Sequence, residues 1–368
     1  IKNTGSVVVQ STEKGTVYLV NTTVTVSNIT SITGAADNLW NRVYISSPYT
    51  DTYLQATGLA DGTYKAYAVD GEGNLSNASN NSVIVDTTAP TANFAAATDD
   101  VGNVTGALTS GSTTDDTALV LSGNNESGSS VKVYNGSTEL GSATVSGTSW
   151  SYSATVANGT TYQFNVRETD LAGNTSDATS NFTVTGDTTA PTVSVTTAII
   201  KNTGNTVVQS TETGTVYLVN TTVTVSNLAS ITGAADNQWN SVAISSPSTN
   251  TNLAATGLAD GTYKAYAVDD TGNLSSASSN SVIVDTTIPT VSSVEITDAD
   301  GDQNSFLNAG DNVSVTATFS EVVNLNNAGG NPTITLVVGS TDRTATYISG
   351  SGSDDLVSRY TIQSGDND

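Results

Sequence analysis

The sequence contains no cysteine, no histidine and no methionine in its 368 residues. Without cysteine and histidine the chain cannot form disulfides, thiol or imidazole nucleophiles, Ser-His-Asp triads, or the usual zinc and haem sites. An extracellular protein that lacks disulfides must be stabilised in another way, and bound metal ions are the obvious candidate. Since the sequence also lacks an initiating methionine and a signal peptide, we expect it to be an internal piece of a longer protein.

Basic residues are scarce as well. Lys and Arg number 10 against 34 Asp and Glu, which gives a formal net charge of −24. A chain this acidic, with no basic cluster, is not expected to bind nucleic acid or an anionic membrane by charge. No apolar run approaches the ~20 residues of a membrane span, so we expect no membrane insertion in this segment. Only eight of the acidic residues are Glu, and the preference for Asp favours turns and sites for hard cations.

The most informative feature that is present is an internal repeat. Residues 1–90 return at 200–289 with a constant offset of 199, no gap, and 17 differences in 90 aligned positions. The motif Asp-Thr-Thr-Ala/Ile-Pro occurs three times, 101 and 98 residues apart, at Asp86–Pro90, Asp187–Pro191 and Asp285–Pro289. Arrays of modules of this size are more typical of reach, spacing and display than of catalysis.

These motifs predict four modules. The first lacks its N-terminal strand, the second is of a different type, the third nearly duplicates the first, and the fourth is incomplete. The third module is preceded by Thr192–Thr196, a plausible first strand. Alternation of two module types is physically sensible, because near-identical neighbours risk misfolding into each other. The predicted boundaries are 1–88, 89–188, 189–287 and 288–368.

Short β-strand signals alternate with turn signals throughout the chain. Thr63–Val69 alternates inward and outward residues after the turn Asp61-Gly62, and Asn135-Gly136 is a hairpin signal. About seven short strands per module predict an all-β fold of tandem immunoglobulin-like β-sandwiches, arranged end to end as an elongated rod. Each of the first three modules offers one Trp and one Tyr as core anchors. These residues are Trp40, Tyr64, Trp150, Tyr162, Trp239 and Tyr263.

The order of motifs in the second module resembles a known family. Glu126–Tyr134 is followed by Thr148–Trp150, Asn158–Thr160, Glu168–Asn174 and Asp187–Pro191. This order is similar to the bacterial Ig-like tandem repeats of giant secreted biofilm adhesins, the type I-secreted, RTX-type proteins. The resemblance covers the whole chain and implies tandem rods, usually with calcium at or near the domain junctions.

The same resemblance extends to the other modules. Glu13 and Glu212 each stand two residues before a Gly, and Asp70–Asn74 and Asp269–Asn273 match the Asp-x-x-Gly-Asn element of the second module. The fourth module is similar to another module of such proteins, through segments such as Phe306–Asp311. We therefore count Glu13 and Glu212 among the candidate calcium ligands. The Asp that opens each linker motif, such as Asp187, is placed to share a cation with adjacent loops.

Calcium is the leading candidate ligand, because it takes six to eight oxygens from carboxylates, amides and backbone carbonyls. In the fourth module an Asp-Ala-Asp-Gly-Asp-Gln-Asn segment offers carboxylates at positions 1, 3 and 5 around a Gly turn, like the first half of a calcium loop. It lacks the bidentate Glu at position 12, where Ala309 stands, which leaves Asp311 or Glu321 to reach in. The alternative is a solvated acidic turn. The candidate ligands are Asp298, Asp300, Asp302, Asn304, Asp311 and Glu321.

Two further groups of acids are candidate calcium ligands. In the second module, acids from different turns are expected to cluster at the end that adjoins the preceding linker, where like carboxylates repel unless a cation neutralises them. These acids are Asp99, Asp100, Asp115, Asp116, Glu126 and Asp170. The other group follows the repeat, and ordinary hydrogen bonding of Asp in turns is its alternative explanation. Its members are Asp70, Glu72, Asp86, Asp269, Asp270 and Asp285.

Carboxylates alone do not predict an enzyme. A glycosidase would use a pair of Asp or Glu residues, but the acids here recur at the same turns in every module, as structural sites do. We therefore expect no catalytic activity. Tyr44, Tyr49 and Tyr53 are candidates for glycan binding. The alternative interpretation is that they are tolerated surface aromatics. The fold does not demand them, since the third module has other residues at these positions: Ala243, Ser248 and Asn252.

The sequence thus predicts the structural stalk of a bacterial cell-surface adhesin. Such a segment is extracellular, is rigidified by calcium, and serves cell adhesion or biofilm formation, with neighbouring modules of the same long chain as its partners. The first alternative is a segment of an extracellular filament or surface layer, in which one chain supplies a missing strand to the next identical chain. The second alternative is a glycan- or surface-binding module.

Overall fold

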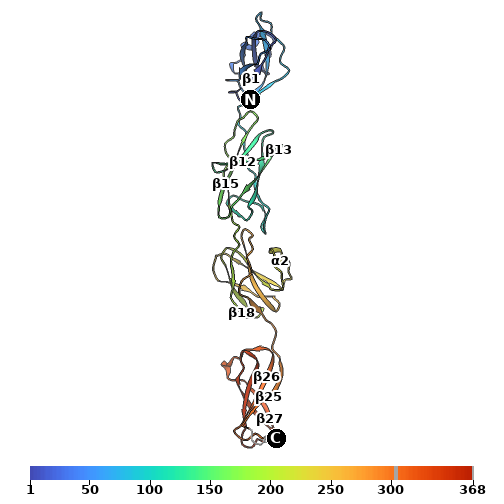
Figure 1. Ribbon diagram of the computed structural model, residues 1–368, viewed down its shortest axis with the longest axis vertical. Coiled ribbons are helices and arrows are strands. Elements are labelled where there is room, and N and C mark those ends of the chain that lie inside the picture. The colour runs from blue at the N-terminus through green and yellow to red at the C-terminus, as the bar shows by residue number, and fades with distance from the viewer. Residues whose placement is uncertain (302–305, 367–368) are drawn as a thin grey trace. The chain divides into compact units, whose positions relative to one another are not determined.

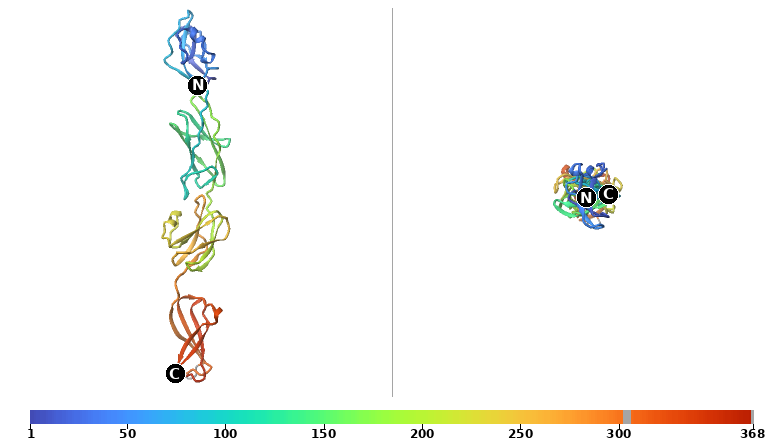
Figure 2. Two further views of the ribbon diagram at one scale, coloured as in Figure 1. Left: turned by 180° about the vertical axis from the view of Figure 1, so that it is seen from behind. Right: turned by 90° about the horizontal axis from the view of Figure 1, so that it is seen from above.

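The computed structural model describes residues 1–301 and 306–366. Nearly every element is a β-strand, and the two α-helices among these residues are five residues long each (Figure 1). The view from behind likewise shows β-strands in each part of the chain (Figure 2). The chain divides into two compact units, Ile1–Ile283 and Val284–Asp368. The predicted all-β fold is therefore confirmed. Among the described residues, no helix has the length and apolar character of a membrane span.

The first sandwich is built from residues 6–85. Its elements are β1 (Ser6–Val9), β2 (Gly15–Asn21), α1 (Ile29–Thr33), the 3-10 helix η1 (Asp37–Leu39), β3 (Trp40–Ile45), β4 (Thr52–Gln55), β5 (Gly62–Asp70) and β6 (Val83–Val85). The strands form two sheets, in the orders β1-β4 and β3-β2-β5-β6. Apolar residues that alternate along these strands, such as Val17 and Leu19, pack with Leu54 of the other sheet in one core.

The second sandwich is built from residues 96–186. Its strands are β7 (Ala96–Asp99), β8 (Gly106–Ala107), β9 (Ser112–Thr114), β10 (Ala118–Asn124), β11 (Ser130–Asn135), β12 (Thr138–Ser142), β13 (Thr144–Ser146), β14 (Ser149–Thr155), β15 (Thr161–Thr169) and β16 (Phe182–Gly186). The sheet orders are β13-β14-β10-β7-β8 and β12-β11-β15-β16-β9. Asn135 pairs with Thr138 across the β11–β12 turn, so the predicted hairpin at Asn135-Gly136 is confirmed.

The third sandwich repeats the first and adds two strands, β17 and β18. Its elements are β17 (Val193–Val195), β18 (Ala198–Ile200), β19 (Asn205–Ser210), β20 (Gly214–Asn220), α2 (Leu228–Thr232), β21 (Trp239–Ile244), β22 (Thr251–Ala254), β23 (Gly261–Asp269) and β24 (Val282–Val284). The sheet orders are β17-β19-β22 and β18-β24-β23-β20-β21. Strand β17 lies inside the segment Thr192–Thr196, so the predicted first strand is confirmed. Val193 and Val195 are buried in the core.

The predicted aromatic anchors occupy the cores to different degrees. Tyr64 and its counterpart Tyr263 are fully buried. The Tyr64 hydroxyl donates to the Ala60 carbonyl at 2.7 Å, and the Tyr263 hydroxyl donates to the equivalent carbonyl, that of Ala259, at 2.7 Å. Trp150 is also buried and donates to the Asn93 carbonyl at 3.0 Å. A buried ring whose polar atom has a partner gains the apolar burial without an unsatisfied donor. The remaining anchors are half-buried: Trp40, Tyr162 and Trp239.

The second unit contains one five-stranded antiparallel sheet in its described residues. Its elements are β25 (Val291–Asp300), β26 (Asn312–Val323), the 3-10 helix η2 (Asn327–Gly329), β27 (Thr333–Val338), β28 (Thr341–Ser349) and β29 (Ser353–Thr361). The order is β25-β26-β29-β28-β27. Val313 and Val315 of β26, which lies between β25 and β29, are buried.

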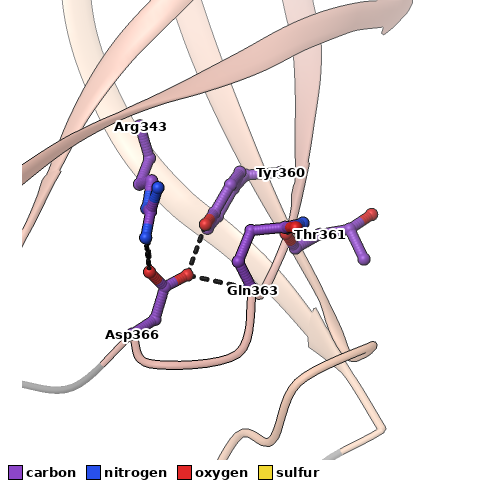
Figure 3. Close-up of polar contacts among 5 residues, drawn as sticks. All are labelled: Arg343, Tyr360, Thr361, Gln363 and Asp366. Carbon is purple, nitrogen blue, oxygen red and sulfur yellow. Dashed lines mark hydrogen bonds and ion pairs between the residues drawn. The ribbon is translucent and has the colours of Figure 1, made fainter.

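A polar cluster closes the end of this sheet (Figure 3). The Asp366 carboxylate accepts hydrogen bonds from the Tyr360 hydroxyl, from the Gln363 backbone N–H at 2.8 Å, and from Arg343 Nε at 2.8 Å. The Tyr360 hydroxyl and the Gln363 N–H hold the pKa of Asp366 below its usual value, with Arg343 adding to the effect. The cluster holds the turn after β29 against strand β28. Its role is structural, since both carboxylate oxygens of Asp366 already accept hydrogen bonds within the protein.

Candidate metal centre

The linker between the second and third sandwiches begins with Asp187, directly after β16. Its backbone N–H donates to the Thr114 carbonyl at 2.8 Å, and its carboxylate Oδ1 accepts from the Thr189 N–H at 3.1 Å. Asp commonly accepts such a hydrogen bond from the backbone two residues further on. These contacts fix the direction in which the linker leaves the second sandwich.

The loop after β23 in the third sandwich receives this linker. Asp269 ends the strand, and its Oδ1 accepts hydrogen bonds from the backbone N–H groups of Thr271 at 2.9 Å, Gly272 at 2.8 Å and Asn273 at 2.9 Å. The Asn273 side-chain Nδ2 donates both to Asp269 Oδ2 at 2.8 Å and to the Asp187 carbonyl at 3.0 Å. One amide group therefore clamps the linker to the loop.

Three acids meet at this junction. One carboxylate oxygen from each of Asp187, Glu212 and Asp269 lies within 4.8 Å of the other two. In the described ranges, 1–301 and 306–366, no other three acids are gathered this closely. Burial of Glu212, together with the charges of Asp187 and Asp269, raises its pKa. The acids line a cleft of about 410 Å³. Calcium favours such a set of hard oxygen ligands, and a cation would relieve the repulsion between them.

The junction between the first and second sandwiches has the same clamp. Asn174 Nδ2 donates to Asp170 Oδ2 at 2.8 Å and to the Asp86 carbonyl at 3.0 Å. Burial acts to raise the pKa of Asp170, but the hydrogen bonds from Asn174 leave it below its usual value. Glu126, another candidate ligand from the second module, is exposed. Both junctions therefore have an Asn that bridges the linker and a loop. Within the described residues, three acids come together only at the second junction.

Sequence reasoning missed the residues that make these clamps. In the sequence, Asn174 and Asn273 stand out only as members of the Asp-x-x-Gly-Asn motif, and the same spacing of four residues from an Asp is repeated at Asn74. Glu168 was also missed. It is fully buried, accepts from the Ser129 hydroxyl at 2.6 Å, and its Oε2 has no hydrogen-bond partner. The only signal was its position two residues before Asp170.

The prediction that all the acids of the second module lie near the preceding linker is wrong. Asp99 is the last residue of β7 and Asp116 precedes β10, and since these strands are antiparallel neighbours, both acids lie at the same end of the sheet. Glu126 follows β10 and so lies at the opposite end. The charge of Asp269 in the third sandwich acts on Asp115, which places that acid toward the following linker.

Asp99, Asp115 and Asp116 form a second acidic group at this end of the second sandwich. Asp99 Oδ2 accepts from the Thr114 hydroxyl at 2.5 Å. Burial, then the charge of Asp99, raises the pKa of Asp115 to about 6. Asp116 is 1% exposed, and its Oδ2 has no hydrogen-bond partner. Asp100 is exposed.

A loop of the second sandwich reaches the third beside this group. Asn103 Nδ2 donates to the Gly272 carbonyl at 2.6 Å, and Asn103 Oδ1 accepts from the Leu228 N–H at 3.2 Å. Gly272 has φ +103, and a Cβ there would lie 2.9 Å from the Val104 backbone nitrogen. The close approach of the two loops therefore requires glycine at this position.

Among the described residues, the candidate acids of the first module do not form a group of three neighbouring carboxylates. Asp70 accepts from the Asn74 side chain at 2.7 Å and from its N–H at 2.7 Å, which lowers the pKa of Asp70. Glu13 and Glu72 are exposed, and Asp86 accepts from the Thr88 N–H at 2.9 Å. In the third module, Asp270 accepts a hydrogen bond from the Thr213 hydroxyl at 2.7 Å. In the linker that follows this module, Asp285 accepts one from the Thr287 N–H at 3.0 Å.

The predicted calcium loop of the fourth module is only partly visible. Asp298 and Asp300 are exposed at the end of β25. Asp311 lies close to the turn, since a Cβ on Gly301 would come 2.3 Å from its Oδ1. The predicted ligands Asp302 and Asn304 lie outside the described residues.

Glu321 does not belong to this loop. In β26 it stands nine residues after Asn312, which pairs with Asp300. At ~3.3 Å per residue this separation is about 30 Å, so the expectation that Glu321 reaches the loop is wrong. Its neighbour Ser320 instead donates from its N–H to the Thr290 carbonyl at 2.8 Å, near the start of the unit.

The raised pKa values predict an inverted pH dependence in the absence of metal. Asp115 titrates at about 6 and the pKa of Glu212 is raised. The folded chain therefore holds protons that the unfolded chain has already released. In EDTA, the thermal midpoint of the first unit should fall as pH rises from roughly 5 to 7.5, because deprotonation then penalises the folded state. Scanning fluorimetry measures this.

The control is Asp115→Asn, which should flatten the slope and raise the midpoint near pH 7.5. Acids with lowered pKa, such as Asp70 and Asp170, lose their stabilising effect only below about pH 4 and do not disturb this window. A midpoint that rises with pH in both proteins would contradict the proposed repulsion.

Comparison with known proteins gives a family for one module. Residues 89–188 match the family model described as a bacterial Ig-like domain. This match supports the resemblance of the second module to bacterial Ig-like repeats, whereas type I secretion and RTX character stay predictions. No curated protein sequence matches the chain.

Similar solved structures include three modular proteins. The fibronectin(III)-like modules of Clostridium thermocellum CbhA are 16% identical, with 48% of this chain and 90% of that chain covered and a TM-score of 0.30. The FN1-FN3 domains of chicken CNTN1 are 11% identical, with 76% and 97% covered and a TM-score of 0.28. The BSP domain of a biofilm associated protein is 12% identical, with 77% and 60% covered and a TM-score of 0.20. Values this low do not indicate a shared function.

Proposed function

We propose that the chain is a non-catalytic stalk segment of a bacterial cell-surface adhesin, extracellular and stiffened by calcium, and that it serves cell adhesion or biofilm formation. The observation that carries the proposal is the trio Asp187, Glu212 and Asp269. One of these acids belongs to a linker and two belong to the next sandwich. A cation bound by all three therefore ties the linker to the module that follows it.

The Asn clamps complement such a site. At both described junctions of the first unit, a loop Asn holds the carbonyl of the linker Asp at 3.0 Å. These hydrogen bonds restrain each linker without a cation, although one neutral hydrogen bond contributes only about 0.5–1.5 kcal/mol. A divalent ion with three carboxylate ligands adds a stronger, removable restraint at the second junction. The stalk would then be stiffest where calcium is plentiful.

The proposal predicts one matched difference between two glutamates. Glu212→Gln should abolish the strongest calcium site, whereas Glu13→Gln should leave it unchanged. Glu13 is the equivalent residue of the near-identical first sandwich, is exposed, and belongs to no trio of acids. Titration calorimetry of each chain with calcium chloride measures the difference. Equal binding by both variants would sink the assignment of this site.

A further inference from the structure

Two threonines of the first linker are held by the sandwich that precedes it. Asp61 Oδ1 accepts hydrogen bonds from the Thr87 N–H at 2.8 Å and from the Thr87 hydroxyl at 2.7 Å, and Oδ2 accepts one from the Thr88 hydroxyl at 2.9 Å. The hydroxyls of Thr87 and Thr88 hold the pKa of Asp61 below its usual value, so the ionised carboxylate makes these contacts at neutral pH. Both oxygens of one turn residue are therefore bonded to the linker.

The second sandwich holds its linker through an amide in the matching turn. Like Asp61, Asn158 directly precedes a Gly. Asn158 Oδ1 accepts from the Thr188 N–H at 3.0 Å, and Asn158 Nδ2 donates to the Thr189 hydroxyl at 2.7 Å. A threonine hydroxyl can donate or accept, so the same Thr-Thr pair fits a carboxylate or an amide. We call the contact of Asp61, or of Asn158, with the two linker threonines the linker latch.

The first latch lies at the end of a short strand. Strand β6 has three residues, and its pairing with β5 runs from Val83 with Tyr64 to Val85 with Gly62. Asp61 directly precedes Gly62, and the linker begins directly after Val85. The latch therefore ties the linker to the segment of the chain that enters β5.

Strand β5 is a firmer support than β6. The other edge of β6 is bonded by Ile1, whose amine donates to the Ile84 carbonyl at 2.8 Å and whose carbonyl accepts from the Asp86 N–H at 2.9 Å. Strand β5, in contrast, is an inner strand of the sheet β3-β2-β5-β6 and pairs with β2 along residues 64–70. A tie to the start of β5 is thus a tie to the middle of the sheet.

The second latch lies at a strand with more support. Strand β16 pairs with β15 on one side and with β9 on the other. Its last residue, Gly186, accepts from the Gly159 N–H at 2.8 Å and donates to the Thr160 carbonyl at 3.0 Å. Asn158 stands next to Gly159, so this latch also lies where the linker leaves the last strand.

The five latch residues Asp61, Thr87, Thr88, Asn158 and the partner threonines of Asn158 are exposed. Exposed hydrogen bonds contribute little to the free energy of unfolding, because water replaces them in the unfolded chain. Their effect is expected under tension instead. A pull on the linker is carried by the few hydrogen bonds of β6, and the first latch adds three more in parallel. Forced unfolding depends on the rate at which loaded contacts break.

We propose that the linker latch is a lock that bears tension along the stalk. It keeps the last strand and the first residues of the linker fixed to the middle of the sheet while the chain is pulled, and this role accounts for the Thr-Thr pair of the linker motif. The inference rests on the proposed stalk function, since a stalk is loaded along its length. It does not depend on calcium, because Asp187, Glu212 and Asp269 take no part in the latch contacts.

Hydrogen exchange of the full chain in EDTA tests the local restraint. Asp61→Ala removes the first latch, so the amides of residues 83–88 should exchange about tenfold faster, since hydrogen bonds to a charged group are lost. Asp61→Asn should keep the slow exchange, because Asn158 shows that an amide holds the same pair. The control is Asn41→Ala, which removes a hydrogen bond to the Gln55 carbonyl of the same sandwich and should leave residues 83–88 unchanged.

Optical tweezers test the mechanical role of the latch on the same variants, pulled end to end in EDTA. Asp61→Ala should lower the force at which one sandwich unfolds, whereas Asp61→Asn and Asn41→Ala should match the unmodified chain. Asn158→Ala should have the smaller effect, because β9 also holds β16. Similar thermal midpoints confirm that each variant is folded.

Three results would overturn the proposal. These are unchanged exchange of residues 83–88 in Asp61→Ala, an unchanged unfolding force in that variant, and an equal loss of force in Asn41→Ala, which would make the latch one stabilising contact among many. Each of them leaves the stalk function standing, because calcium binding and the extended shape are measured separately by calorimetry and scattering.

Discussion

Chelation of divalent cations with EDTA is expected to lower the thermal midpoint of the chain, and added calcium is expected to restore it. An ion that binds only the folded state stabilises it by about 2.7 kcal/mol at a hundred times its dissociation constant. For a domain of about 100 residues, each kcal/mol shifts the midpoint by roughly 4–8 °C, so a shift of roughly 10–20 °C is expected for the sandwich that holds the site. Differential scanning calorimetry measures it.

The control separates the junction site from general screening of the −24 charge. Glu212→Gln should lose most of the calcium shift, and Glu13→Gln should keep it. Magnesium at equal concentration screens charge similarly but suits open, flexible oxygen sites poorly, so it should restore less of the midpoint. If EDTA leaves the melting curve unchanged, the proposed calcium site is wrong.

The fold was predictable because its signals are local and repeated. Alternation along Thr63–Val69 and the turn at Asn135-Gly136 each specify an element without reference to distant residues. The internal repeat then allowed one sandwich to be read from another, and Thr192–Thr196 could be recognised as a strand by its position before the repeated segment. Tyr64 and Tyr263 were likewise predictable as anchors, since each follows a tight Gly turn.

The site was predictable in its residue types and not in its grouping. Asp187, Glu212 and Asp269 were all candidates, but they stood among many equivalent acids, and the sequence does not say which loops share an end of a sandwich. Asp99 and Asp116 illustrate the error, since only the antiparallel pairing of β7 and β10 places them at the far end of the second sandwich.

The bridging amides were missed for a different reason. Asn is common in turns because its side chain bonds the local backbone. Asn273 makes such a local bond to Asp269, and nothing in the sequence reveals that the same amide also reaches the Asp187 carbonyl. A contact between a linker and a loop 86 residues away depends on the docking of two modules, which local propensity does not encode.

The stalk function predicts an extended particle in calcium. Strands of nine residues, such as β5, β15 and β23, span about 30 Å at ~3.3 Å per residue, so four modules laid end to end should exceed roughly 120 Å. A compact globule of 368 residues would have a radius of gyration near ~21 Å. Small-angle X-ray scattering in calcium should therefore give a radius well above that value, since the Pro of each linker favours extended neighbours.

Removal of calcium should broaden the distribution of distances in the same experiment, because the acids at the second junction then repel. The Asn273→Ala variant sharpens the test. Without the amide clamp, the cation is the main remaining restraint on this linker, so EDTA should change the scattering of the variant more than that of the unmodified chain. Asn74→Ala removes the equivalent amide from the first sandwich, which donates to Asp70 of its own loop and, within residues 1–301 and 306–366, to no linker, and this variant should behave like the unmodified chain. A calcium-loaded radius close to the globular value would mean that the modules fold back on one another, and the stalk function would have to be abandoned.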